Sequence, residues 1–123
     1  MVSVLLLEDD DDLRDTLELA LHVSGIDSVR SLKRVEDLTA LGPRVADDTC
    51  AILDVNLGHD QPTGIDASEW LRSNGYAGSI VFLTGHAGAY PQLREACERF
   101  RGTLLEKPAP IPHLISFVRE SAR

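Results

Sequence analysis

The stretch that decides the fold is VSVLLLEDDDD, residues 2–12. A short apolar run is followed at once by five consecutive acidic residues. Short runs rich in Val, Ile and Leu are typical of strands buried on both faces of a parallel sheet, so we predict a strand over residues 2–7. The acidic residues would then lie beyond the carboxyl end of this strand, where open α/β sheets bind their ligands.

Four further short apolar segments alternate with segments of helical period along the rest of the chain. The further predicted strands are residues 26–30, 50–53, 79–84 and 103–105. Helices are predicted over about residues 13–24, 34–41, 65–74, 91–100 and 111–122, with a long loop before the fourth. Since βα units connect by right-handed crossovers, this order predicts an α/β fold: a doubly wound, five-stranded parallel sheet of flavodoxin-like order 2-1-3-4-5, with helices on both faces.

Length and composition set limits on the class of protein. A chain of 123 residues, 43% of them hydrophobic, is suited to a single domain with its own core. The net charge of −8 provides no attraction for nucleic acid or for anionic membranes. The two cysteines indicate neither a disulfide framework nor a zinc site, and no run is long enough to span a membrane. We therefore expect a cytoplasmic protein without a direct nucleic-acid or membrane partner.

Residues capable of chemistry follow four of the predicted strands. They are Glu8 and Asp9 after the first strand, Asp54 and Asn56 after the third, Thr84 at the end of the fourth and Lys107 after the fifth. Parallel strands end at the same edge, so these groups should converge. Two carboxylates ~4 Å apart repel by about 4 kcal/mol at an effective dielectric constant near 20, and such a cluster favours a hard divalent cation, best Mg²⁺. A phosphoryl group beside that cation would be neutralised by Lys107 and Thr84, with Asp54 as the nucleophile.

Four motifs in this order resemble the receiver domains of two-component response regulators, and the resemblance covers essentially the whole chain. The motifs are Glu8-Asp9, Leu53-Asp54-Val55-Asn56, Phe82-Leu83-Thr84-Gly85 and Glu106-Lys107-Pro108. The resemblance implies that Asp54 is the phosphoacceptor. It also implies metal ligation by Asp9 directly, by Glu8 through water and by Asn56 through its backbone carbonyl. Thr84 and Lys107 would hold the phosphoryl oxygens, and the Lys107–Pro108 peptide bond would be cis.

The same resemblance implies a function and partners. A receiver domain takes a phosphoryl group from the phosphohistidine of a sensor histidine kinase or a histidine phosphotransferase, in a transfer that it catalyses itself. The added charge then changes the binding of an output protein, which the sequence does not identify. We expect residues 1–123 to form one such signalling domain rather than an enzyme, either free-standing or excised from a longer protein.

Two features depart from the usual receiver pattern. The loop of residues 57–64 is two residues longer before its glycine than usual, and Gly58 stands where a proline is common. Leu104 occupies the position three before Lys107, which is normally aromatic. In these respects the chain resembles an atypical receiver subgroup, common in alphaproteobacteria, that lacks the aromatic switch. We therefore expect residues 85–92 to relay the signal.

Other interpretations of the same residues stay open. A small magnesium-dependent phosphohydrolase of the haloacid dehalogenase type also uses an aspartate nucleophile, and Asp9 to Asp11 could supply its Asp-x-Asp motif. A degenerate receiver would act as a phosphorylation-independent interaction module. The acidic run could also simply begin a helix, an interpretation that suits its last two residues. His86 is interpreted as a loop histidine and is placed outside the site.

Overall fold

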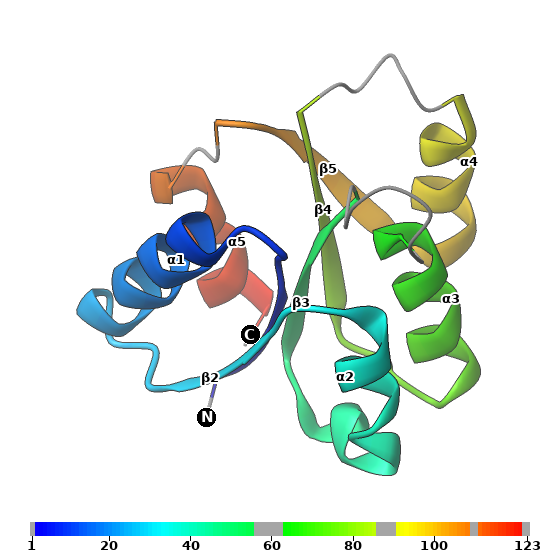
Figure 1. The fold of residues 1–123 in the computed structure, drawn as a ribbon, viewed down its shortest axis with the longest axis horizontal. Helices are drawn as coiled ribbons and strands as arrows, with labels where there is room; N and C mark the ends of the chain where they lie inside the picture. Colours follow the sequence, from blue (N-terminus) through cyan, green and yellow to red (C-terminus); the bar gives the residue numbers. More distant parts are fainter. Residues whose placement is uncertain (1, 56–62, 86–90, 109–110, 122–123) are drawn as a thin grey trace.

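The computed structural model describes residues 2–55, 63–85, 91–108 and 111–121. Five parallel strands form one sheet in the order β2-β1-β3-β4-β5 (Figure 1). The strands are β1 (Ser3–Leu7), β2 (Ser28–Leu32), β3 (Cys50–Asp54), β4 (Ser79–Thr84) and β5 (Gly102–Glu106). The fold class and the strand order predicted from the sequence are thus confirmed.

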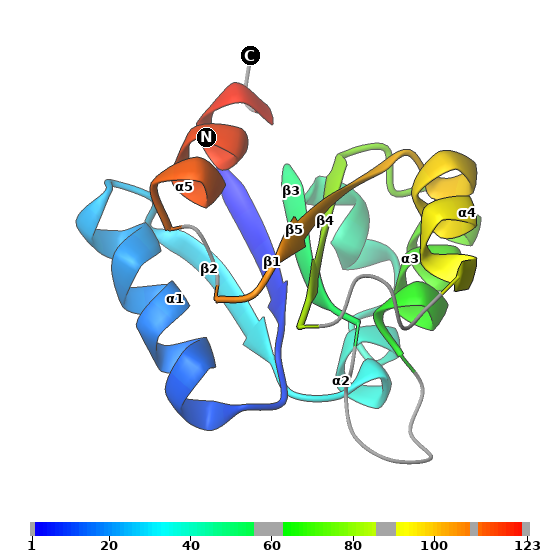
Figure 2. The same cartoon turned by 90° about the horizontal axis from the view of Figure 1, so that it is seen from above.

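Helices cover both faces of the sheet. They are α1 (Asp11–Val23), α2 (Val35–Thr39), the 3₁₀ helix η1 (Gly42–Asp47), α3 (Gly64–Ser73), α4 (Pro91–Phe100) and α5 (Ile111–Ser121). Helices α1 and α5 lie on one face, and α2, α3 and α4 lie on the other (Figures 1 and 2). Among the described residues, no helix combines the length and the apolar character needed to cross a membrane.

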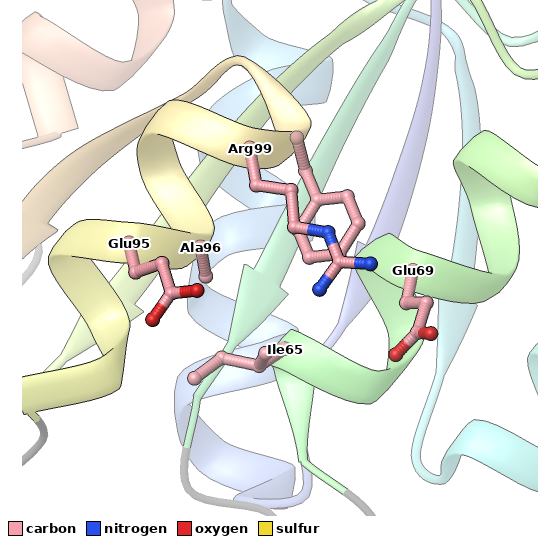
Figure 3. Close-up of a pocket in the computed structure, with 6 residues that line it drawn as sticks. Ile65, Glu69, Glu95, Ala96 and Arg99 are labelled. Carbon is pink, nitrogen blue, oxygen red and sulfur yellow. The ribbon is translucent and has the colours of Figure 1, made fainter.

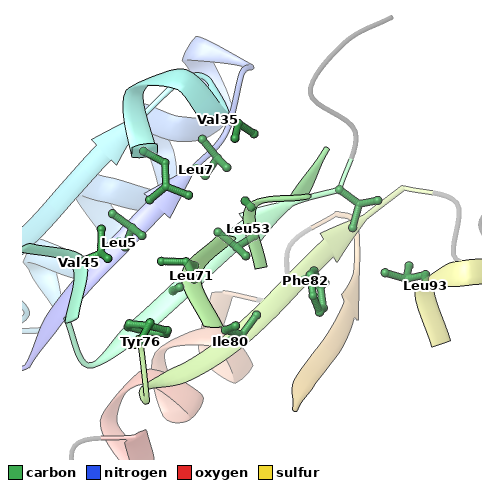
Figure 4. Packing of buried hydrophobic residues seen from close by; sticks show 14 residues of the cluster. Leu5, Leu7, Val35, Val45, Leu53, Leu71, Tyr76, Ile80, Phe82 and Leu93 are labelled. Carbon is green, nitrogen blue, oxygen red and sulfur yellow. The ribbon is translucent and has the colours of Figure 1, made fainter. Parts of the chain in front are cut away.

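The core is divided by the sheet into two clusters because successive side chains of a strand point to opposite faces. In β1, Leu5 and Leu7 pack in the cluster under α2, α3 and α4, which Figure 4 shows. Val4 and Leu6 pack in the cluster under α1 and α5. All four side chains are fully buried, which explains why the strand is a continuous apolar run rather than an alternating one.

Strand β2 begins two residues later than predicted from the sequence. Residues 26–30 were expected to form it, but Ile26 belongs to the end of α1. The Gly25 N–H donates to the His22 carbonyl at 3.0 Å, and the Ile26 N–H donates to the Leu21 carbonyl at 2.9 Å. Gly25 has φ +91°, the left-handed conformation that ends many helices in this way. Ile26 is therefore buried as a helix-terminating contact, and the strand starts at Ser28.

The predicted helix over residues 34–41 is also shorter in the structure. Helix α2 ends at Thr39, and the chain continues into η1 from Gly42. Gly42 has φ +60°, and the Pro43 that follows it cannot donate a backbone hydrogen bond to extend α2. These two residues separate α2 from η1, which the sequence analysis did not predict.

Candidate functional site

Two carboxylates and a lysine meet at the carboxyl end of the sheet. Glu8 directly follows β1 and Asp54 ends β3, and their exposed fractions are 0% and 1%. Lys107, just after β5, places its Nζ atom 3.0 Å from Glu8 Oε1 and 3.2 Å from Asp54 Oδ1. The structure therefore brings together three of the residues that the sequence singled out.

Asp9 completes a cluster of three carboxylates. One oxygen each from Glu8, Asp9 and Asp54 lies within 4.8 Å of the other two, and Asp9 is half-buried. Oxygen ligands at this separation are what a hard cation such as Mg²⁺ binds. Among the described residues, the basic side chain within 4.0 Å of these carboxylates is that of Lys107, and its one positive charge leaves excess negative charge that fits the predicted Mg²⁺.

Thr84 ends β4 beside this cluster and is 1% exposed. The Lys107 N–H donates to the Thr84 carbonyl at 2.8 Å, so the backbone connects the ends of β4 and β5. The Lys107–Pro108 peptide bond is cis, as the family resemblance implied. Asn56 and His86 lie outside the described residues, and so do most of residues 57–64, the loop that departs from the family pattern, and most of residues 85–92, which were expected to relay the signal.

The electrostatics of the site favour a proton or a cation next to Asp54. Burial raises the pKa of Asp54 from 3.8 to about 8, and the hydrogen bond and negative charge of Glu8 add to the effect, while Lys107 opposes it. Burial lowers the pKa of Lys107, but Glu8 and Asp54 together more than offset this, and the pKa is raised. The lysine is therefore held in its charged form.

The acidic run after β1 serves two purposes. Glu8 and Asp9 belong to the site, whereas Asp10 is the N-cap of α1 and accepts a hydrogen bond from the Leu13 N–H at 3.1 Å. Asp11 and the residue after it occupy the first helical turn, where negative charge is favourable. The interpretation of the last acidic residues as a helix start is thus correct, and it is compatible with a site formed by the first two.

Arg14 is a residue of this region that the sequence analysis missed. Its Nη1 atom donates to the Glu8 carbonyl at 2.9 Å, and its Nη2 atom donates to Asp11 Oδ1 at 2.6 Å. The hydrogen bond from Arg14 also holds the pKa of Asp11 below its usual value. Arg14 thereby fixes the first turn of α1 against the backbone of Glu8. The spacing of three between Asp11 and Arg14 was the available signal, but it does not indicate contact with the site.

Gly64 allows α3 to pack directly on the backbone of Asp54. A Cβ at this position would overlap the Asp54 carbonyl oxygen. The Gly64 N–H also donates to the Val55 carbonyl at 3.3 Å. The side chain of Thr63 caps the helix by accepting hydrogen bonds from Ile65 N–H at 3.2 Å and from the next amide at 3.4 Å. The start of α3 is therefore fixed relative to Asp54.

The family model of the response regulator receiver domain matches residues 4–119. The chain belongs to this family. No curated protein matches this receiver domain in sequence. Among solved structures, it is similar to the Vibrio cholerae chemotaxis protein CheY4, with TM-score 0.79, 21% identity and 98% of each chain covered. The receiver domain of NtrX from Brucella abortus gives TM-score 0.79 and 21% identity over 97% of each chain. A CheY-like receiver domain from Methylobacillus flagellatus gives TM-score 0.79 and 23% identity over 98% of each chain.

Family membership confirms the resemblance that the four motifs indicated. Receiver domains are signalling domains of two-component systems, they interact with histidine kinases or phosphotransferases, and they bind Mg²⁺ at an acidic pocket. Membership supports a phosphoacceptor role for this receiver domain and removes the reason to consider a haloacid dehalogenase-type phosphohydrolase.

Proposed function

We propose that this receiver domain accepts a phosphoryl group on Asp54 from the phosphohistidine of a sensor histidine kinase or a histidine phosphotransferase. Phosphorylation then changes its affinity for an output protein. The observation that carries the proposal is the position of Lys107, whose Nζ atom lies 3.2 Å from Asp54 Oδ1 at the carboxyl edge of the sheet. A fixed cation beside a buried carboxylate is what a phosphoryl-transfer site requires to neutralise the incoming charge.

In the proposed transfer, an Asp54 carboxylate oxygen attacks phosphorus. A P–O bond to Asp54 forms while the P–N bond of the phosphohistidine breaks, and the released imidazole nitrogen takes up a proton from solvent. Lys107 is proposed to pair with one phosphoryl oxygen and the Thr84 hydroxyl to donate a hydrogen bond to another. A Mg²⁺ ion held by Asp9, by Asp54, by Glu8 through water and by the backbone carbonyl of Asn56 would neutralise further phosphoryl charge.

The protonation state of Asp54 links the site to its reactivity. Only the carboxylate form is a nucleophile, and without a metal its pKa is raised to about 8. Positive charge bound next to Asp54 favours the carboxylate form.

The test is phosphorylation by a small phosphodonor such as acetyl phosphate with Mg²⁺, followed by mass spectrometry. The expected result is the mass gain of one phosphoryl group, localised to Asp54 and removed by hydroxylamine, as an acyl phosphate requires. Asp54→Asn should lose the label. The matched control is Asp48→Asn, because Asp48 is the other buried aspartate among the described residues and lies just before β3, at its opposite end.

Labelling that survives in Asp54→Asn would move the acceptor to another residue and contradict the assignment. A folded protein that takes no label from the phosphodonor or from any histidine phosphotransferase would instead be a degenerate receiver that acts only by binding. Label lost in both Asp54→Asn and Asp48→Asn would show that the loss reports damage to the fold.

A further inference from the structure

A groove between α3 and α4 lies outside the site described above (Figure 3). Its volume is about 140 Å³, and it is open to solvent on one side. Its lining residues are Ile65 and Glu69 of α3 and Glu95, Ala96, Arg99 and Phe100 of α4. The apolar members form the inner surface, where Ala96 is 4% exposed and Phe100 8%. The charged members stand around the opening.

The size of the groove matches one apolar side chain. A cavity of roughly 150 Å³ holds a benzene molecule, so a space of this volume accommodates one leucine or phenylalanine side chain. The groove is therefore suited to a short segment that presents a single apolar residue.

The walls of the groove are fixed in position by Arg72. Its Nε atom donates to the Phe100 carbonyl at 2.9 Å, at the end of α4. Its Nη1 atom donates to the carbonyls of Tyr76 at 2.9 Å and Gly78 at 2.8 Å. These bonds connect the end of α3 to the end of α4 and to the start of β4. Because the groove is already formed, a partner would not need to order it on binding.

The charges at the opening favour a basic partner. Glu69 and Glu95 lie on opposite sides of the groove (Figure 3), and both are exposed. Within the part of the chain that the structure describes, neither carboxylate has a basic group within 4.0 Å. The guanidinium of Arg99 is instead engaged over the Phe100 ring, 5.3 Å from its centroid. The opening therefore offers two carboxylates that are not ion-paired with Arg99 or with another described basic group, in a chain of net charge −8.

We propose that the α3–α4 groove docks a partner protein through one leucine or phenylalanine side chain flanked by lysine or arginine. The apolar side chain enters between Ile65 and Ala96, and the basic neighbours pair with Glu69 and Glu95. Arg99 covers the inner apolar surface when the groove is empty and repels the basic flank when the partner arrives. This surface is separate from the phosphoryl site, so the proposal does not depend on the phosphorylation chemistry.

The test is an NMR titration of the whole ¹⁵N-labelled chain, without phosphodonor, with two synthetic peptides. One peptide carries a single leucine flanked by lysines, and its twin carries glutamates in place of the lysines. The lysine peptide should shift the amide signals of residues 65–69 and 95–100 most, and the glutamate peptide should bind more weakly. Equal binding of the two peptides, or shifts centred elsewhere on the chain, would overturn the proposal.

Three variants test the sign of each charge. Glu69→Gln and Glu95→Gln should each lower the affinity for the lysine peptide by about two- to fivefold, which is the range expected for the loss of one exposed ion pair. Arg99→Gln should strengthen it, because it removes a like charge and uncovers the Phe100 ring. Glu36→Gln on α2 makes the same charge change at an exposed position outside the groove and serves as the control. A uniform effect of all glutamate variants, or weaker binding by Arg99→Gln, would show that the groove charges do not select the partner.

Discussion

Replacing the proposed phosphoacceptor should stabilise the metal-free fold. One oxygen each of Glu8 and Asp9 lies within 4.8 Å of an Asp54 oxygen, and Lys107 Nζ lies 3.2 Å from Asp54 Oδ1. At an effective dielectric constant near 20, the repulsion of Asp54 by each of the other two carboxylates is at least about 3.5 kcal/mol, and its attraction to Lys107 offsets about 5 kcal/mol of this. The net repulsion on an ionised Asp54 is then about 2 kcal/mol. Asp54→Asn keeps the size of the side chain and removes this repulsion, so its free energy of unfolding should be higher by about this amount.

The stabilisation should depend on pH with a defined sign. The pKa of Asp54 is raised from 3.8 to about 8, chiefly by burial and then by Glu8. Between these two pH values, the folded protein retains a proton that the unfolded chain has released. The free energy of unfolding of the native protein therefore falls as the pH rises from about 4 to about 8. The asparagine variant has no such group. The difference between its free energy of unfolding and that of the native protein should therefore be near zero at about pH 4 and greatest above about pH 8.

Urea denaturation in EDTA, at about pH 4.5 and at about pH 8.5, measures this difference for the native protein and for Asp54→Asn. Asp48→Asn is the contrasting variant: Asp48 is buried and lies 3.7 Å from Arg30 Nε, so its removal should destabilise rather than stabilise. Adding Mg²⁺ should reduce the difference in free energy of unfolding between Asp54→Asn and the native protein, because the cation stabilises the native cluster by mass action. An asparagine variant that is less stable than the native protein at the higher pH, or an advantage independent of pH, would refute the reasoning.

Two further predictions concern the metal and the packing of the sheet. Millimolar Mg²⁺ should raise the Tm of the native protein. Asp9→Asn should reduce that rise, because it removes one of the three carboxylates of the cluster. Thermal melts that show no effect of Mg²⁺ on either protein would contradict the proposed metal site. Gly102→Ala should cost about 1–3 kcal/mol, because its Cβ would overlap the Phe82 ring across the β4–β5 pair. Adding Phe82→Leu should recover part of the loss in urea denaturation, and an alanine variant as stable as the native protein would exclude the overlap.

The ends of the strands could be predicted from the sequence because they depend on local patterns and on one topological rule. The apolar run before Glu8 and the run that ends at Asp54 are each recognisable alone. Parallel pairing through right-handed crossovers then places both carboxylates, with Lys107, at one edge. No knowledge of side-chain packing is needed for that step, and the structure accordingly brings these three groups within direct contact.

Residues that act through distant backbone atoms could not be predicted in the same way. Arg72 donates to the carbonyl of Phe100, which lies 28 positions further along the chain, and nothing local to either residue indicates that bond. Such a bond depends on tertiary packing, which a pattern of apolar residues does not contain. The start of β2 was misplaced for a different, local reason: the Ile26 N–H donates back to the Leu21 carbonyl and closes α1, and an apolar pattern alone does not distinguish this from the start of a strand.

Burial of a carboxylate is not by itself what distinguishes the site. Asp48 is also buried, but its Oδ1 accepts a hydrogen bond from Ser3 Oγ at 2.6 Å and lies near Arg30, so its charge is locally compensated. Asp54 lies in a cluster with Glu8 and Asp9; burial, and then Glu8, raise its pKa more than Lys107 lowers it, so its ionised form opposes folding. A fold selected for stability alone would replace one of the three. Their grouping at one edge of the sheet is therefore accounted for by a function that brings positive charge to them.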